Sequence, residues 1–193
     1  MSTGSASKAK VSIDPGYVIK LTGTLLGICA VVALLLGAVN YITKPIIDQM
    51  QAEKTAAAMA EVLVADEYVP VEGDFGSVTA LYEAVSGGEC VGYVAEVSTN
   101  GFGGAISMVV GVNADGTVSG VAVTKHTETG NIGTKVVNDP AVLARFVGMT
   151  HADGEITVNE GANCFDGISG ATVSSRGVTA GVNAALSAVG SLN

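Results

Sequence analysis

The longest apolar run lies near the start of the chain, at residues 21–42 (LTGTLLGICAVVALLLGAVNYI), and contains no charged side chain. A helix of this length spans roughly 33 Å at about 1.5 Å per residue, which matches the hydrocarbon core of a bilayer. The apolar region of a cleaved signal peptide is shorter, about 7 to 15 residues. The pattern therefore predicts a membrane helix over residues 17–42, after a polar tail of residues 1–16.

A helical period of apolar residues continues over residues 43–65, in a segment rich in alanine and glutamate. One helical stripe is apolar, and we expect this stalk helix to pack it onto the domain that follows. The stripe consists of Ile46, Met50, Ala57, Ala60 and Val64.

Beyond residue 89 the period shifts toward two, which is typical of strands. Residues 90–98, 105–112 and 117–125 are rich in valine, and an Asp115-Gly116 pair separates the last two, as in a hairpin. The alternation predicts an antiparallel sheet. In its first strand we expect Val91, Tyr93, Ala95 and Val97 to face one side.

Helical signals follow the strands. Asp139 and Pro140 are typical of an N-cap and a first helical residue, and they predict a helix over 141–147 that Gly148 ends. Residues 155–158 predict a short strand, and apolar residues at helical spacing predict a last helix from residue 177 to residue 189. Strands grouped together with flanking helices indicate an α+β domain over residues 66–193.

Charge predicts on which side of the membrane this domain lies. Lys8, Lys10 and Lys20 against Asp14 give the N-terminal side a net charge of +2, and basic flanks stay preferentially in the cytoplasm. From residue 43 onward, six basic and seventeen acidic residues give a net charge of −11. We therefore expect an extracytoplasmic domain, and so acidic a surface disfavours a nucleic-acid partner.

Cysteine and histidine offer little metal chemistry. Cys90 and Cys164 both fall in the expected outer domain, so a disulfide between them is possible but not required. The chain has no C-x-x-C motif, and only His126 and His151 supply imidazole groups. A zinc or iron–sulfur site built by this chain is not expected.

Residues 166–177 (DGISGATVSSRG) combine hydroxyl groups, glycines, one carboxylate and one arginine between a strand and a helix. Unpaired backbone N–H groups near residues 174–176, at a helix N-terminus, would attract an anion such as phosphate. Gly170 lets the backbone approach closely, Arg176 can neutralise charge, and Thr172 offers a hydroxyl. On chemistry alone, these residues favour a polar loop that only caps a helix.

The residue types in this loop match a known sequence motif. Residues 166–172 (DGISGAT) fit D-x-x-[ST]-G-A-T, which resembles the flavinylation signature of FMN-binding domains in the G subunit of Rnf complexes and in the C subunit of the sodium-translocating NADH:quinone reductase. The membrane helix, the TKP that follows it, GFGGAISMVVGVNADGTVSGVAV and KHTETGNIGTKV also occur in the family's order. The resemblance covers roughly residues 18–190.

The resemblance implies FMN held covalently by a phosphoester to Thr172, installed by a flavin transferase for which Asp166 and Ser169 serve as recognition residues. An acid–base role for Asp166 is not expected, because the sequence places no partner carboxylate at a useful spacing from it. The phosphate would lie at the start of the last helix, where Ser174 and Ser175 are expected to act as caps. The motif residues expected around the cofactor are Ser169, Gly170, Ala171, Ser174, Ser175 and Arg176.

The family places a glycine-rich loop and an H-x-E-T loop near the flavin. In this chain His126, Glu128 and Thr129 occupy the second loop, which has Gly130-Asn131 where the family has proline-glycine. Both of these residues suit a tight turn. Phe102, in the glycine-rich loop, is expected either beside the flavin ring or in the core.

The implied function is electron transfer within a bacterial or archaeal membrane complex that couples ferredoxin:NAD⁺ oxidoreduction to Na⁺ or H⁺ transport. The implied partners are integral-membrane and iron–sulfur or flavin subunits, the flavin transferase and membrane lipid. This chain has no G-x-G-x-x-G motif, so other subunits would bind NAD. Its length favours the G subunit of the Rnf complex over the C subunit of the reductase. The alternatives are another membrane-anchored extracytoplasmic flavoprotein and a pilin-like structural module without enzymatic function.

Overall fold

The computed structural model describes residues 15–192, which divide into two units with their boundary between Gln49 and Met50. Helix α1 runs from Pro15 to Val62 and includes Pro45 in its interior. The predicted membrane and stalk segments are therefore parts of one helix. Residues 15 and 16, predicted to belong to the polar tail, are helical, and the rest of that tail lies outside the described residues.

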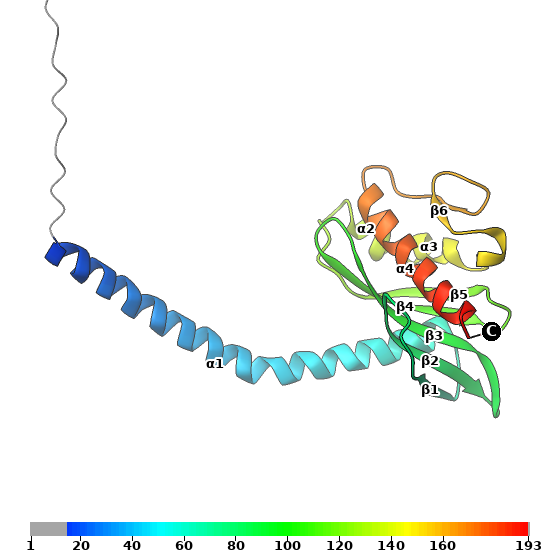
Figure 1. The fold of residues 1–193 in the computed structure, drawn as a ribbon, viewed down its shortest axis with the longest axis horizontal. Helices are drawn as coiled ribbons and strands as arrows, with labels where there is room; N and C mark the ends of the chain where they lie inside the picture. Colours follow the sequence, from blue (N-terminus) through cyan, green and yellow to red (C-terminus); the bar gives the residue numbers. More distant parts are fainter. Residues whose placement is uncertain (1–14, 193) are drawn as a thin grey trace, which may run out of the picture. The chain divides into compact units, whose positions relative to one another are not determined.

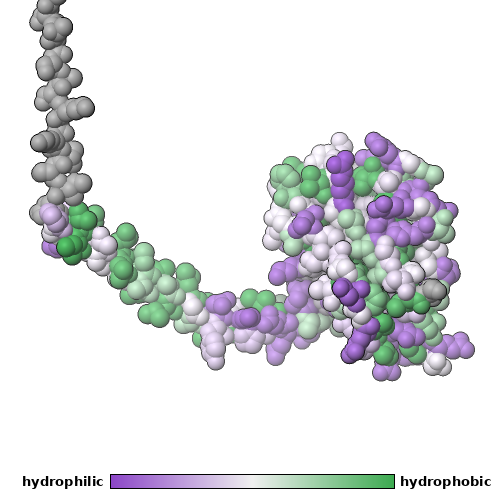
Figure 2. Space-filling model, in the orientation of Figure 1, coloured by the Kyte–Doolittle hydropathy of each residue, from purple (hydrophilic) through white to green (hydrophobic). Residues whose placement is uncertain are grey.

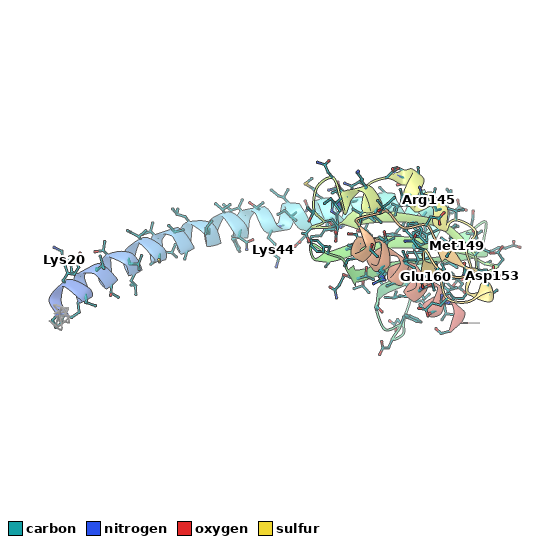
Figure 3. All side chains as sticks on the ribbon, turned by 90° about the horizontal axis from the view of Figure 1, so that it is seen from above. Lys20, Lys44, Arg145, Met149, Asp153 and Glu160 are labelled. Atoms are coloured by element: carbon teal, nitrogen blue, oxygen red, sulfur yellow. The ribbon has the colours of Figure 1, made fainter. Side chains whose placement is uncertain are left out.

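The first part of α1 carries the apolar run. Lys20 and Lys44 bracket a stretch without charges (Figure 3), and apolar side chains cover the surface of this stretch (Figure 2). Residues 17–42 are exposed rather than packed into a core. The helix is long and apolar enough to cross a membrane, and its exposure supports an anchor rather than a core helix.

A five-stranded antiparallel sheet forms the centre of the second unit (Figure 1). Each strand pairs with its neighbours in chain order, which makes the sheet a simple meander. The predicted antiparallel sheet is confirmed, and the three predicted segments correspond to β3, β4 and β5. The strands are β1 (Glu67–Val71), β2 (Val78–Ser86), β3 (Glu89–Asn100), β4 (Ala105–Asn113) and β5 (Val118–Lys125).

Strand β3 departs from the predicted alternation at its start. The register against β2 shifts where Ala84 pairs with Gly92 and Val85 pairs with Cys90, which leaves Val91 as an extra residue. Val91 consequently packs into the cluster on the opposite face of the sheet from Tyr93. The prediction that the two share a face was wrong because an extra residue reverses the alternation.

The two faces of the sheet are covered by helices distant in the sequence. Helix α4 packs on one face (Figure 1), and the last turns of α1 pack on the other. In α1 the buried residues are Ala58, Met59 and Val62. The predicted stripe was wrong, because its members Met50, Ala57, Ala60 and Val64 are exposed.

The remaining elements follow the five-stranded sheet in the chain. As predicted, Asp139 caps α3 by accepting a hydrogen bond from the N–H of Ala141, and Pro140 is its first residue. The predicted helix over 141–147 is shorter than expected, because α3 ends at Leu143 and continues only as the 3-10 helix of Ala144–Phe146 before Gly148, which has a φ of 84°. Only two residues of the predicted strand at 155–158 pair, and they pair in parallel with β7. These elements are α2 (Thr134–Val137), α3 (Pro140–Leu143), the 3-10 helices η1 (Ala144–Phe146) and η2 (His151–Asp153), β6 (Thr157–Val158), β7 (Cys164–Phe165) and α4 (Thr172–Gly190).

Candidate functional site

The loop before α4, residues 166–171, is fixed by hydrogen bonds to its backbone groups. The carbonyl of Asp166 accepts from Arg145 Nη1 at 2.9 Å, and the N–H of Gly167 donates to Asn159 Oδ1 at 2.8 Å. The N–H of Ala171 donates to the carbonyl of Ile168 at 2.9 Å. These bonds hold the loop, while the side chains of Asp166 and Ser169 remain exposed.

Helix α4 begins at Thr172, five residues before the predicted start. Its N-cap residue is Ala171, which has no side-chain oxygen to accept from the helix. Among the described residues, no acceptor is found for the backbone N–H groups of Thr172, Val173 and Ser174. The first turn thus offers three free N–H groups to an anion.

Ser174 and Ser175 do not cap this helix, which corrects the prediction. Both side chains are buried within its first turns. Ser174 Oγ donates to Glu128 Oε2 at 2.6 Å, and Ser175 Oγ accepts from the N–H of Ile168 at 3.2 Å. The reason is the earlier start of α4, which moves both serines from the helix end to positions inside it.

A cavity of about 290 Å³ opens beside this helix end. Its sides come from the β3–β4 loop, from the loop after β5 and from the first turn of α4. Phe102, Ile132 and Val173 are apolar lining residues with exposed fractions of 71%, 51% and 48%. The remaining lining residues are Glu128, Thr129, Gly133, Gly170, Ala171, Thr172 and Ser174.

The lining combines an apolar rim with few polar groups, which is typical of a site for a small organic ligand. Thr172 is exposed at its edge, at the first position of α4. Gly170 has a φ of 83°, a conformation that glycine adopts without strain, and it directs the chain into the helix. A planar apolar ligand with an anionic group would therefore fit between the rim and the helix end.

The H-x-E-T loop contributes to the cavity unevenly. Glu128 and Thr129 line it, whereas His126 does not. His126 Nε2 instead lies 2.9 Å from Asn138 Oδ1, and its Nδ1 accepts from the N–H of Glu128 at 3.3 Å. Asn131 has a φ of 63°, which fits the turn expected at this position.

Glu128 is buried, with 8% of its surface exposed, and accepts two hydrogen bonds. Besides Ser174, the N–H of Gly103 donates to its Oε1 at 3.2 Å. Cβ atoms on Gly101 or Gly133 would collide with its carboxylate oxygens. Glycine at both positions thus leaves the space that the buried carboxylate occupies.

Arg176 lies outside the cavity. It lines a different hollow together with Glu155, Glu160 and Asn183. Cys90 and Cys164 are free thiols, so the structure contains no disulfide between them. Within residues 15–192, no group of three or more acidic, histidine or cysteine side chains is arranged to hold a metal ion.

Three lining residues escaped the sequence reasoning: Ile132, Gly133 and Val173. Val173 follows Thr172 directly, and Ile132 and Gly133 lie three and four residues after Thr129 in the quoted segment KHTETGNIGTKV. Including the whole of that segment and one residue after the motif would have found all three. Phe102 is not a core residue, because it is exposed at the rim of the cavity.

Comparisons with known proteins identify the family. Residues 101–187 match the family of the FMN-binding domain. The G subunit of the Na⁺-translocating ferredoxin:NAD⁺ oxidoreductase complex of Acetobacterium woodii is 32% identical, with 92% of this chain and 94% of that protein covered. The G subunit of the ion-translocating oxidoreductase complex of Methanosarcina acetivorans is 35% identical, with 90% and 95% covered.

A solved structure shows the same fold. The C subunit of the Na⁺-translocating NADH-quinone reductase of Parabacteroides distasonis aligns with a TM-score of 0.52 and 21% identity, over 70% of this chain and 80% of that one. The cavity and its motif loop lie within the segment that matches the FMN-binding domain. The chain therefore belongs to the family of G subunits of the ion-translocating (Rnf) oxidoreductase complexes and contains an FMN-binding domain.

Proposed function

We propose that this protein is the electron-transfer flavoprotein subunit of a membrane-bound ferredoxin:NAD⁺ oxidoreductase complex and carries FMN on Thr172 through a phosphoester. The observation that carries the proposal is the helix end at Thr172. An exposed threonine hydroxyl, three free backbone N–H groups and an apolar-rimmed cavity lie together at this point. The family relationship supports FMN as the occupant.

The residues present fit FMN. The free N–H groups of Thr172, Val173 and Ser174 suit a phosphate, which the partial positive charge of a helix N-terminus also favours. Phe102, Ile132 and Val173 supply apolar surface for the ring. A cavity of about 290 Å³ is at the lower end of ligand-site volumes, roughly 300–1,000 Å³, and suits one part of the cofactor.

Bound FMN supplies the redox chemistry, and the chain supplies attachment, orientation and electrostatics. Thr172 would hold the cofactor by its phosphate and leave the ring unmodified. The apolar rim would exclude water from part of the ring, while the hydrogen-bonded loop of residues 166–171 keeps Thr172 at the edge of the cavity. A covalent bond retains the cofactor on a domain outside the cytoplasm, where lost FMN would be hard to replace.

The intact mass of the protein tests whether FMN is attached covalently. Full-length protein produced together with a flavin transferase is expected to gain the mass of FMN less one water and to fluoresce as a flavin in a denaturing gel. Protein produced without the transferase is the control and is expected to show neither signal. Wild-type protein without the added mass, despite an active transferase, would contradict the proposal and favour a structural module.

The topology proposal places the N-terminus in the cytoplasm and the acidic domain outside. It rests on the net charge of +2 before the apolar run and on the lack of charges in that run. Protease added to spheroplasts is expected to remove the domain of residues 66–193 and to leave a membrane-bound fragment. A domain that is degraded only after the membrane is lysed would reverse the orientation.

The partners we propose are the other subunits of the complex, the flavin transferase during maturation, and membrane lipid around α1. Electron flow through the complex would drive Na⁺ or H⁺ transport in other subunits, because the exposed apolar stretch of α1 contains no charged residue to carry an ion. Asp166 and Ser169 are exposed in the loop that precedes Thr172, which would leave both side chains accessible to the transferase.

A further inference from the structure

The carboxylate of Glu128 stands apart from the other acidic groups because it is buried against the cavity. Its Oε2 accepts from Ser174 Oγ at 2.6 Å, and its Oε1 accepts from the N–H of Gly103 at 3.2 Å. No lysine or arginine among residues 15–192 pairs with it. Both contacts are donors, so each oxygen of the carboxylate has a hydrogen-bond partner.

The same carboxylate joins the three segments that surround the cavity. Gly103 belongs to the β3–β4 loop, Ser174 to the first turn of α4, and Glu128 to the loop after β5. Close packing of Gly101 and Gly133 against the carboxylate leaves it little freedom to move. The negative charge is therefore held in one place beside the ligand space.

We propose that Glu128 sets the redox potential of the flavin site: its fixed carboxylate lowers the midpoint potential of bound FMN, and its bonds to Gly103 and Ser174 position the β3–β4 loop and the first turn of α4. The inference rests on the proposed function. Reduction adds electrons to the ring, and a negative charge held nearby in a partly dehydrated cavity opposes that addition. Glu128 thus makes the bound cofactor a stronger reductant.

The experiment compares full-length flavinylated proteins in detergent by reductive titration with dithionite and a reference dye. Glu128→Gln keeps the shape and an oxygen for the Gly103 N–H but removes the charge, so its midpoint potential is expected to move to a more positive value. Glu160→Gln removes the same charge at an exposed position, labelled in Figure 3, that lines the hollow around Arg176. This variant is expected to leave the potential unchanged. Equal potentials for wild type and Glu128→Gln would overturn the inference.

Ser174→Ala is the second variant, since it keeps the charge and removes one of the bonds that hold it. We expect a positive shift smaller than that of Glu128→Gln, because a loosened carboxylate spends less time beside the ring. If Glu128→Gln fails to take up FMN, the midpoint potential of Ser174→Ala is compared with that of wild type instead. Equal potentials for these two proteins would then overturn the inference.

Hydrogen exchange tests the positioning role without the cofactor. In unloaded protein, the peptide that covers residues 101–104 is expected to exchange faster in Glu128→Ala than in wild type, because the Gly103 N–H loses its acceptor. Equal exchange would contradict the positioning role. If wild type and variant both carry FMN and have equal midpoint potentials, only the inference about Glu128 is overturned. If wild type fails to take up FMN, the proposed function is overturned and the inference with it.

Discussion

Replacing Thr172 by alanine is expected to abolish the covalent flavin completely. The hydroxyl is the proposed acceptor of the phosphoester, and alanine removes it without altering the N-cap residue Ala171 or the hydrogen bonds of residues 166–171. Because Thr172 is exposed, the free energy of unfolding should change by no more than about 0.5 kcal/mol. Intact mass and in-gel flavin fluorescence measure the loss.

Two matched variants separate attachment from general damage to the cavity. Thr172→Ser retains a hydroxyl at the first position of α4 and is expected to keep a detectable covalent signal. Thr129→Ala removes the other threonine hydroxyl that lines the cavity and is expected to keep the added mass. A flavin mass that survives in Thr172→Ala would place the attachment on another residue.

The second large effect is expected for Gly133→Ala. Gly133 has φ and ψ of −62° and −34°, which alanine adopts readily, so any loss comes from the added methyl group. That group would collide with Glu128 Oε2 and would lie 2.8 Å from Ser174 Oγ. Overpacking of this kind costs about 1–3 kcal/mol, and it would also displace the buried carboxylate from the cavity wall.

Gly130→Ala is the control within the same loop. No atom lies within 4 Å of a Cβ added at Gly130. Its stability is expected to stay within about 0.5 kcal/mol of wild type or to rise slightly, because alanine reduces the freedom of the unfolded chain. The free energy of unfolding is measured for Gly133→Ala, Gly130→Ala and wild type by urea unfolding followed with circular dichroism. The yield of flavinylated protein is compared for the same three proteins. Equal stability and equal flavin yield for the two variants would show that the Glu128 contacts tolerate displacement.

Local patterns in the sequence were sufficient for most elements. The valine-rich alternation located β3, β4 and β5, and the Asp139-Pro140 pair located the start of α3. Such signals succeed because the period of side chains and the chemistry of a cap act over a few residues. They failed at Val91 and at the packed face of α1, where a bulge and the contact of Val62 with the sheet decide which side is buried.

The start of α4 shows the same limit at the site. Serine and threonine are good caps, so the sequence favoured a helix that begins after Ser175. In the folded domain Ser174 and Ser175 instead bond to Glu128 and to the backbone of Ile168, and the helix begins at Thr172. Tertiary partners for these two hydroxyls outweighed their local preference for capping.

The sequence by itself determined the apolar helix, the antiparallel sheet, the class of cofactor through its motif, and Thr172 as the proposed attachment residue. Only the tertiary structure decided that Glu128 and Ser174, 46 residues apart, meet beside one cavity. It also decided that Phe102, Ile132 and Val173 share its rim. The physical reason is that such contacts depend on how separate loops pack against one sheet, and no local period or motif spacing encodes that packing.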